Sequence, residues 1–230
     1  MLSVKDLTIE YPGGLRALDG VSFTLPQGEN AALIGANGAG KSSLLLSLVG
    51  VLPPASGEIA IDGTLLTKKT LRETRKRLQL VFQNPDDQLF MPTIFEDVAF
   101  GPRSFGMSEE ETLTRVQESL SRLGIAHLKN RSPIALSGGE KRLCAIATVL
   151  SLTPEFLLFD EPTAFLDPKA RRSLAETLLQ LPQGKLIATH DLPFARQTCS
   201  RVLLLREGKL LYDGGAEVLE DAALLEEAGL

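Results

Sequence analysis

The sequence predicts an α/β fold with a mainly parallel sheet, and three observations support this prediction. Short apolar runs of strand length recur along the chain, helical patterns separate most of them, and the first one leads into a glycine-rich loop. The runs cover residues 31–34, 79–82, 156–159, 186–189 and 202–205. Strands that alternate with helices are typical of βαβ units, in which helices cover a parallel sheet.

Two segments carry the turn signals of antiparallel hairpins. Residues 58–61 end in Asp62-Gly63, and residues 202–205 continue through Glu207-Gly208 into residues 209–212. An acidic residue followed by glycine favours the tight turns that join antiparallel strands. We therefore expect antiparallel strands beside the parallel ones, including an antiparallel β subdomain in the N-terminal part of the chain.

A helical segment interrupts the predicted core. Ser108 and Glu111 have the spacing of a capping box, an apolar stripe follows, and Gly124 closes the helix. It lies in a stretch of about 70 residues between two core strands, which is longer than a βαβ crossover requires. We expect a single domain, residues 1–230, in which residues 84–155 form an inserted α-helical subdomain. Residues 1–83 and 156–230 then form the core with its antiparallel β subdomain.

The composition narrows the possible functions. The chain has 230 residues and a net charge of −5, which lacks the basic footprint of a nucleic-acid binder, so we expect no nucleic-acid partner. Cys144 and Cys199 lie in apolar stretches, where we expect buried thiols in a reducing compartment. No apolar run approaches the roughly 18 residues that span a membrane. If the protein serves transport, another chain must supply the passage.

Residues 35–42 read Gly-Ala-Asn-Gly-Ala-Gly-Lys-Ser and match the phosphate-binding pattern G-x-x-x-x-G-K-[ST]. Glycines let the backbone curl so that its N–H groups, together with the start of the next helix, face phosphate oxygens. Lys41 would reach the β- and γ-phosphates of ATP, and Ser42 would bind Mg²⁺. The candidate nucleotide-binding residues here are Gly35, Asn37, Gly38, Ala39, Gly40, Lys41, Ser42 and Ser43.

Two acidic residues follow the apolar run 156–159. A buried strand would present Asp160 to the metal ion, usually through water, and Glu161 could polarise the attacking water. Many buried strands end in acids for structural reasons alone. Beside the phosphate loop, the pair instead indicates ATP hydrolysis.

The segment Leu136-Ser137-Gly138-Gly139-Glu140 is the most diagnostic string of the chain. Ser137 can cap the following helix, while Gly138 and Gly139 leave N–H groups uncovered for a second anion. An ordinary capped helix is the alternative. Phosphate loop, Leu-Ser-Gly-Gly-Glu segment and acidic strand, in this order, resemble an ABC-type ATPase over essentially the whole chain. The resemblance implies a P-loop NTPase core.

The resemblance implies roles for further residues. Tyr11 resembles the aromatic residue that stacks on adenine, although a half-buried strand tyrosine would look the same. Gln83 resembles the switch glutamine that links Mg²⁺ and water to the membrane partner, and His190 the switch histidine that contacts the γ-phosphate. Asp167 resembles the acidic end of the loop that crosses between paired subunits, and it can also cap the helix at Pro168. The catalytic candidates are Glu161, His190 and Gln83, and the metal candidates are Ser42, Gln83 and Asp160.

Several positions depart from the family pattern. Glu140 and Lys141 stand where many ABC transporters carry glutamine and arginine, and Ser43 replaces a common threonine. Phe165 stands where the crossing loop usually has a small residue, which leaves the packing of this loop open but not the reaction.

The resemblance also implies a pair of subunits. In that family, the phosphate loop of one subunit and the Ser-Gly-Gly segment of another close on the same ATP. A single subunit offers one helix start to a highly charged triphosphate, and residues 137–139 of a partner would complete the donors. We expect a head-to-tail dimer, with a second copy or a paralogue, that holds two ATP molecules.

Residues 83–90 are similar to the switch-glutamine segment of energy-coupling-factor importer ATPases, which take up cobalt, nickel or vitamins. Asn84-Pro85 forces an extended exit from the strand, and Asp86 and Asp87 suit the start of a short helix. A solvated acidic turn is the alternative. The importer resemblance implies an integral membrane scaffold, a substrate-binding membrane subunit and a peripheral position on the cytoplasmic face of the membrane. Cobalt or nickel is favoured over a vitamin by this resemblance alone.

Two other functions compete with import. A non-transport ABC ATPase acting on nucleic acid or ribosomes usually has two ATPase units, coiled-coil arms or a basic surface, none of which the sequence contains. A regulatory module that only binds ATP is disfavoured because Glu161 and His190 are both present.

Overall fold

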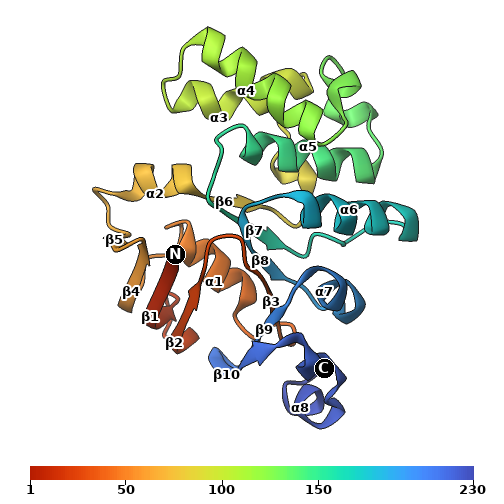
Figure 1. Cartoon of the computed structure of the whole chain (residues 1–230). Helices are drawn as coiled ribbons and strands as arrows, with labels where there is room; N and C mark the ends of the chain where they lie inside the picture. Colours follow the sequence, from red (N-terminus) through yellow and green to blue (C-terminus); the bar gives the residue numbers. More distant parts are fainter. The chain divides into compact units, whose positions relative to one another are not determined.

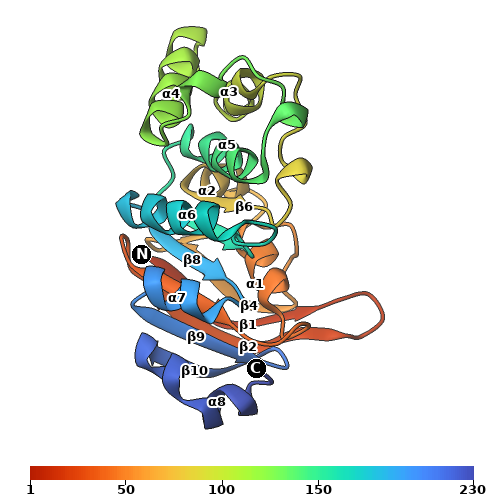
Figure 2. The same ribbon diagram turned by 90° about the vertical axis from the view of Figure 1, so that its right-hand side faces the viewer.

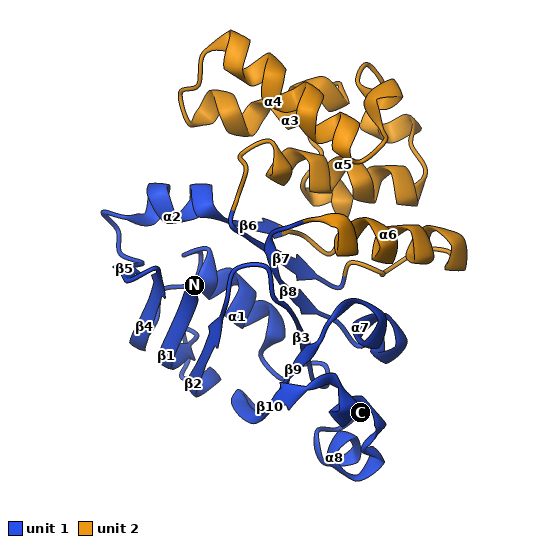
Figure 3. Cartoon of the chain, in the orientation of Figure 1, with its two compact units in different colours: residues 1–80, 155–161, 182–230 blue, residues 81–154, 162–181 orange.

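The computed structural model describes residues 1–230 and contains two compact units (Figures 1 and 3). Unit 1 consists of Met1–Leu80, Glu155–Glu161 and Pro182–Leu230, and it contains both sheets. Unit 2 consists of Val81–Pro154 and Pro162–Leu181, and it is helical. The chain therefore leaves unit 1 and returns to it twice.

The smaller sheet of unit 1 is antiparallel, with strand order β2-β1-β4-β5. Its strands are β1 (Leu2–Glu10), β2 (Arg16–Leu25), β4 (Ser56–Ile61) and β5 (Thr64–Leu65). Side chains of β1 alternate between buried and outward positions, but the register shifts between Val4 and Leu7, where Asp6 has a φ of 46°. The expected antiparallel subdomain and the Asp62-Gly63 turn are both confirmed.

The larger sheet has the order β10-β9-β3-β8-β7-β6, and its inner strands are parallel. Its strands are β3 (Asn30–Ile34), β6 (Leu78–Val81), β7 (Phe156–Asp160), β8 (Gly184–Ala188), β9 (Arg201–Arg206) and β10 (Lys209–Gly215). β3, β7 and β8 are nearly continuous runs of buried residues, as expected for strands covered on both faces. β9 and β10 form the expected antiparallel hairpin through Glu207-Gly208.

The core of unit 1 lies between the two sheets, where α1 (Lys41–Leu48) is located (Figure 2). Leu44, Leu45 and Leu48 of α1 are fully buried against side chains from strands of both sheets. Burial on this scale stabilises by about 1.5–3 kcal/mol per large apolar side chain, so α1 is anchored in the core of unit 1. The other helical segments of unit 1 are α2 (Leu71–Arg77), α7 (Leu192–Thr198), η4 (Ala216–Glu220) and α8 (Ala222–Glu227).

Unit 2 is built on α3 (Ile94–Ser104), α4 (Glu109–Arg122), α5 (Gly138–Leu150) and α6 (Pro168–Gln180). Three short turns of 3-10 helix accompany them. η1 (Pro85–Asp87) precedes α3, and η2 (Ala126–Leu128) and η3 (Pro133–Ala135) lie between α4 and α5. The capping box of Ser108 and Glu111 is present at the start of α4, as the spacing predicts. The predicted α/β fold with a helical subdomain is thus confirmed.

Two further observations concern the chain as a whole. Cys144 and Cys199 are both buried free thiols, as expected. No helix has the length and apolar character that crossing a membrane requires.

Candidate functional site

The loop from Gly35 to Gly40 connects β3 to α1 and is packed so closely that two of its glycines have no room for a side chain. A Cβ atom on Gly35 would lie 2.3 Å from the carbonyl oxygen of Leu205, and one on Gly40 would lie 2.5 Å from that of Ala17. Gly40 also has a φ of 108°, which disfavours other residues. The phosphate-binding pattern therefore has a steric reason in this fold, because the loop lies directly against neighbouring backbone.

Lys41, the first residue of α1, folds its side chain back over this loop. Its Nζ atom donates to the carbonyl oxygens of Gly35 at 2.7 Å and Ala36 at 3.1 Å. Burial lowers the pKa of the ammonium group, and the nearby carboxylates of Glu161 and Asp160 oppose that shift. A positive charge is thus placed inside the curl of the loop, where phosphate oxygens can compete for its hydrogen bonds.

Asp160 ends β7 and lies beside the phosphate loop. Burial raises the pKa of its carboxyl group, while a hydrogen bond from the Ser42 side chain and the charge of Lys41 act in the opposite direction. One hydroxyl and one carboxylate fit Mg²⁺, which favours hard oxygen ligands. The chain has no cluster of three or more metal-binding side chains. This donor set suits Mg²⁺, because that ion is usually held by one or two carboxylates together with substrate phosphates and water.

Glu161 and His190 form a pair at the carboxyl ends of two neighbouring strands. The Nδ1 atom of His190 lies 2.9 Å from Oε2 of Glu161, and the backbone N–H of His190 donates to the same oxygen at 3.3 Å. Glu161 is 7% exposed and has a φ of 43°, a strained conformation for a non-glycine residue. Its N–H donates to the carbonyl oxygen of Ala188 in β8. Both residues are predicted from the sequence, but their contact is not.

Tyr11 follows the end of β1 and is half-buried. Its hydroxyl lies 3.1 Å from Oγ of Ser43 in α1, so the two candidate nucleotide-binding residues are directly connected. An open cavity of about 690 Å³ borders the ring and is lined by Ile9, Glu10, Tyr11, Pro12, Gly14, Leu52, Pro53 and Ala55. The ring is therefore accessible to a flat ligand on a mostly apolar surface.

Gln83, the predicted switch glutamine, lies in unit 2 just after β6. Arg142 of α5 fixes the backbone here, because its two terminal nitrogens donate to the carbonyl oxygens of Phe82 at 2.7 Å and Gln83 at 2.6 Å. Arg142 is 1% exposed, and burial lowers its pKa to about 10. Arg142 is not among the residues predicted from the sequence, where its only signal is one arginine within a mostly apolar helix.

Gln88 and Lys141 add two more connections between this segment and α5. The side-chain amide of Gln88 accepts from the N–H of Phe82 at 3.1 Å and donates to the carbonyl oxygen of Ala145 at 2.8 Å and the hydroxyl of Thr148 at 2.7 Å. Lys141 pairs with Asp86 at 2.6 Å. The acidic turn is therefore not merely solvated.

Ser137, Gly138 and Gly139 lie at the N-terminal end of α5 in unit 2. Ser137 caps the helix as predicted, and Glu140 completes a capping box. Oε2 of Glu140 accepts hydrogen bonds from the hydroxyl of Ser137 at 2.7 Å and from its backbone N–H at 2.8 Å. These bonds lower the pKa of the Glu140 carboxyl group. A carboxylate thus already lies at the predicted second anion-binding helix start.

The loop before α6 completes this face of unit 2. Asp167 caps α6, as predicted, by accepting hydrogen bonds from the N–H groups of Lys169 and Ala170, each at 2.8 Å. A Cβ atom on Gly138 would lie 3.8 Å from the carbonyl oxygen of Phe165, so this loop runs directly beside the start of α5.

Comparisons with known proteins agree on one family. A family model described as ABC transporter matches residues 18–164. A putative ABC transporter ATP-binding protein of Geobacter sulfurreducens is 49% identical, over 93% of this chain and 86% of that protein. The energy-coupling factor transporter ATP-binding protein EcfA of Methanothermobacter thermautotrophicus is 44% identical, over 100% of this chain and 76% of that protein. The cobalt import ATP-binding protein CbiO of Rhodobacter capsulatus is 45% identical, over 100% of this chain and 84% of that protein.

Solved structures give the same result. The structure of cbiO1 from Clostridium perfringens, described as part of the ABC transporter complex cbiONQ, has a TM-score of 0.87 and 36% identity and covers 96% of this chain and 90% of that one. The dimeric structure of MJ0796, a bacterial ABC transporter cassette, has a TM-score of 0.82 and 28% identity and covers 94% of this chain and 99% of that one. The same cassette is also known in a post-hydrolysis state with ADP and phosphate.

Proposed function

The chain belongs to the ABC transporter family of ATPases, and from this premise we propose that it is the ATP-hydrolysing motor subunit of a membrane importer. The observation that carries the proposal is the Glu161–His190 pair, which lies at the same end of the parallel strands as the phosphate loop; the charge of Glu161 acts on Lys41. Glu161 would take a proton from the attacking water, and His190 would orient Glu161 and reach the γ-phosphate.

ATP would be held by the loop of residues 35–42, with the adenine ring stacked on Tyr11. Mg²⁺, held by Ser42 and, through water, by Asp160, would neutralise the charge that develops on the transferred phosphoryl group. Gln83 is proposed as a further ligand that reports the state of the nucleotide to the membrane partner. The accessible face of Tyr11 and the hydrogen bond between Ser42 and Asp160 support these assignments.

Two subunits would share each ATP in a head-to-tail dimer. Residues 137–139 at the start of α5 would donate N–H groups to the nucleotide bound on the phosphate loop of the other subunit. The dimeric form of a structural relative supports this arrangement. The second subunit would be another copy or a paralogue, and ATP binding would close the pair.

The membrane scaffold would dock on unit 2 near the segment that follows Gln83. Phe90 and Phe100 are exposed there and meet edge to face, with ring centroids 5.2 Å apart. A cavity of about 400 Å³ adjoins them, lined by Met91, Glu96, Phe100, Arg103 and Ser104. Exposed aromatic residues around a cavity suit an apolar helix of a partner. The subunit would then be peripheral, on the cytoplasmic face of the membrane.

An import function also requires a substrate-binding membrane subunit, which would select the cargo. Cobalt or nickel is favoured over a vitamin because one relative is a cobalt import protein and one structural relative belongs to a cbiONQ complex. No residue of this chain would contact the cargo.

The test is metal uptake by vesicles that contain the ATPase with the membrane proteins of its operon. Wild-type protein should import labelled Co²⁺ or Ni²⁺ with ATP, while Glu161→Gln should bind ATP, stay dimeric and neither hydrolyse nor import. Import that does not require ATP, or equal turnover by the two proteins, would refute the motor role. A vitamin imported in place of metal would correct only the cargo.

A further inference from the structure

Phe165 combines two unfavourable features on the surface of unit 2. Its side chain is 89% exposed, and its backbone lies in the left-handed region with a φ of 62°. A bulky residue in this region is a genuine outlier, and such strain is concentrated at functional sites. Neither feature stabilises the isolated chain. The exposure is explained if the ring becomes buried in an assembly.

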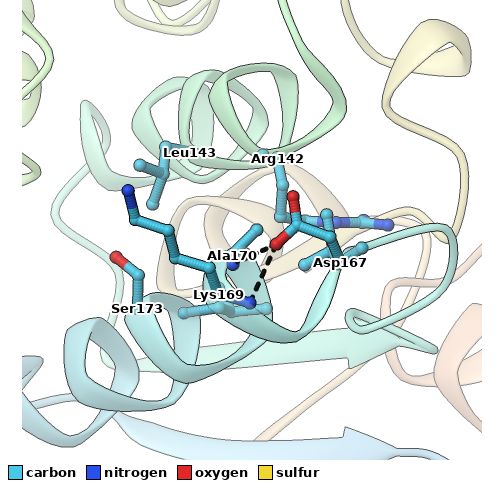
Figure 4. Close-up of a pocket in the computed structure, with 9 residues that line it drawn as sticks. Arg142, Leu143, Asp167, Lys169, Ala170 and Ser173 are labelled. Atoms are coloured by element: carbon cyan, nitrogen blue, oxygen red, sulfur yellow. Dashed lines mark hydrogen bonds between the residues drawn. The ribbon is translucent and has the colours of Figure 1, made fainter.

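A cavity of side-chain size opens beside the same loop, between α5 and α6 (Figure 4). Its volume is about 230 Å³, which is below the roughly 300–1,000 Å³ of small-molecule pockets. The apolar part of its wall consists of Leu143, Leu166, Ala170 and Leu174. Figure 4 shows Lys169 reaching past Leu143, with Asp167 across the cavity. The cavity therefore suits one large apolar side chain better than a cofactor.

Phe165 does not fill this cavity in its own chain, although the loop that carries it supplies Leu166 and Asp167 to the wall. In a two-fold interface, a residue of one copy that meets a site on the other is matched by the reverse contact. Phe165 and the cavity share one loop, so an approach that brings the ring of one copy to the other also brings the cavity.

The cavity is continuous with the surface that the dimer would use. Its wall includes Gly139, which belongs to the segment proposed to contact the ATP of the other subunit. A second copy would therefore reach this cavity as it closes on the nucleotide.

We propose that Phe165 of each copy inserts into the α5–α6 cavity of the other copy when ATP closes the pair. This inference rests on the proposed function, because it needs the ATP-bound dimer. Phe165 then acts as the buried aromatic anchor of the interface, a common role of such residues. The departure from a small residue at this position selects a partner subunit that has an apolar cavity between α5 and α6.

The first test measures self-association with ATP in the Glu161→Gln background, which should trap the dimer. Phe165→Ala should weaken dimerisation at least about tenfold, as removal of an interface hot spot does, with ATP binding by the monomer unchanged. Phe165→Leu, which keeps an apolar side chain, should lose less. Equal dimerisation by Phe165→Ala and the parent would overturn the inference. This holds even if the variant fails to bind the membrane scaffold, because Phe165 would then contact the scaffold and not the second copy.

The second test locates the ring. Phe165→Cys protein is mixed with Ser173→Cys protein, both in the trapped background, and treated with a short thiol-specific linker. Ser173 lines the cavity, and the natural thiols are buried. Linked dimers should form in the mixture with ATP. Linkage between two Phe165→Cys chains, with none between a Phe165→Cys chain and a Ser173→Cys chain, would mean that the two loops meet each other and would refute the cavity assignment.

The two proposals fail in different ways. If the trapped protein with intact Phe165 does not associate with ATP, the proposed dimer fails, and the anchor role fails with it. If the trapped protein associates with ATP and the Phe165 variants associate equally well, the dimer stands and the anchor role alone is wrong.

Discussion

Single charges at the ends of helices matter most where a nucleotide must bind. Glu140 keeps its carboxylate bonded to Ser137 at the start of α5, the place proposed for the phosphates of a partner's ATP. A negative charge at a helix start is favourable in the isolated subunit and repels an incoming anion. In the proposed dimer, Glu140 would therefore stabilise the separated subunits relative to the closed pair.

The variant Glu140→Gln tests this effect. Glutamine keeps the capping box and removes the charge, so ATP-dependent dimerisation should strengthen by about two- to fivefold, the size of a helix-end charge effect. The gain should shrink at high salt, because exposed charges are screened. Sedimentation of the trapped dimer at low and high salt measures both. Glu140→Ala is the control, since it also removes the charge but should lower the melting temperature. A gain that is the same at all salt concentrations would rule out an electrostatic origin.

A buried lysine should make stability depend on pH. Lys185 in β8 is 1% exposed and donates to Oδ1 of Asn30 and the carbonyl oxygen of Gln183, and burial lowers its pKa to about 8 from 10.5. Between these values the unfolded chain binds more protons than the folded one, so stability should rise with pH from about 8 to 10.5. The gain is at most about 3 kcal/mol.

Lys185→Met is the matched control for this effect, because it lacks the titrating group but keeps a similar shape. The free energy of unfolding of the wild type, relative to Lys185→Met, should increase between pH 7 and pH 10 in urea titrations. A constant difference would mean that Lys185 keeps its usual pKa in the folded protein.

At the scale of elements, α5 and the segment after β6 form one mechanical connection. The side-chain amide of Gln88 accepts from the N–H of Phe82 and donates to the backbone of α5. Arg142 donates to the carbonyl oxygens of Phe82 and Gln83. A movement at Gln83 is therefore expected to reach α5, which carries the segment proposed to contact the second ATP. This connection would couple the membrane partner to closure.

Gln88→Ala should break part of this connection. It leaves the N–H of Phe82 and the carbonyl of Ala145 with one hydrogen bond fewer, so ATPase activity without the scaffold should stay near normal while stimulation by the scaffold falls severalfold. ATPase assays with and without reconstituted scaffold give the comparison, and Asp87→Ala on the same turn is the control. Normal stimulation of Gln88→Ala would show that coupling takes another route.

The elements that could be predicted from sequence are those whose signals are local. The strands of the larger sheet, the capping box of α4 and the loop of residues 35–42 each follow from a few adjacent residues. The Glu161–His190 contact and the role of Arg142 could not be predicted, because both depend on pairing between segments distant in sequence. The close approach of Leu205 to Gly35 is another such case, where the pattern gave the residue and only the fold gave the reason.

At the scale of the whole molecule, the proposed dimer makes each ATP site a composite of two copies. The phosphate loop and residues 137–139 of one chain would then serve different nucleotides. A variant defective in one of these elements is expected to be complemented by a variant defective in the other, which no site formed within a single chain allows.

Lys41→Ala and Gly138→Asp form the complementing pair. Lys41→Ala removes the phosphate-binding charge, and Gly138→Asp adds a repelling carboxylate at a position where a Cβ atom has only an ordinary contact at 3.8 Å. Each variant alone should be inactive. In a one-to-one mixture, half of the dimers would be mixed and each would keep one intact site, so ATPase activity should return to about a quarter of normal if the two sites act independently. Because a mixed dimer places both defects in the same composite site, the recovery measures directly whether the subunits share their nucleotides. A mixture as inactive as its components, while each variant still dimerises with wild-type protein, would contradict shared sites that act independently.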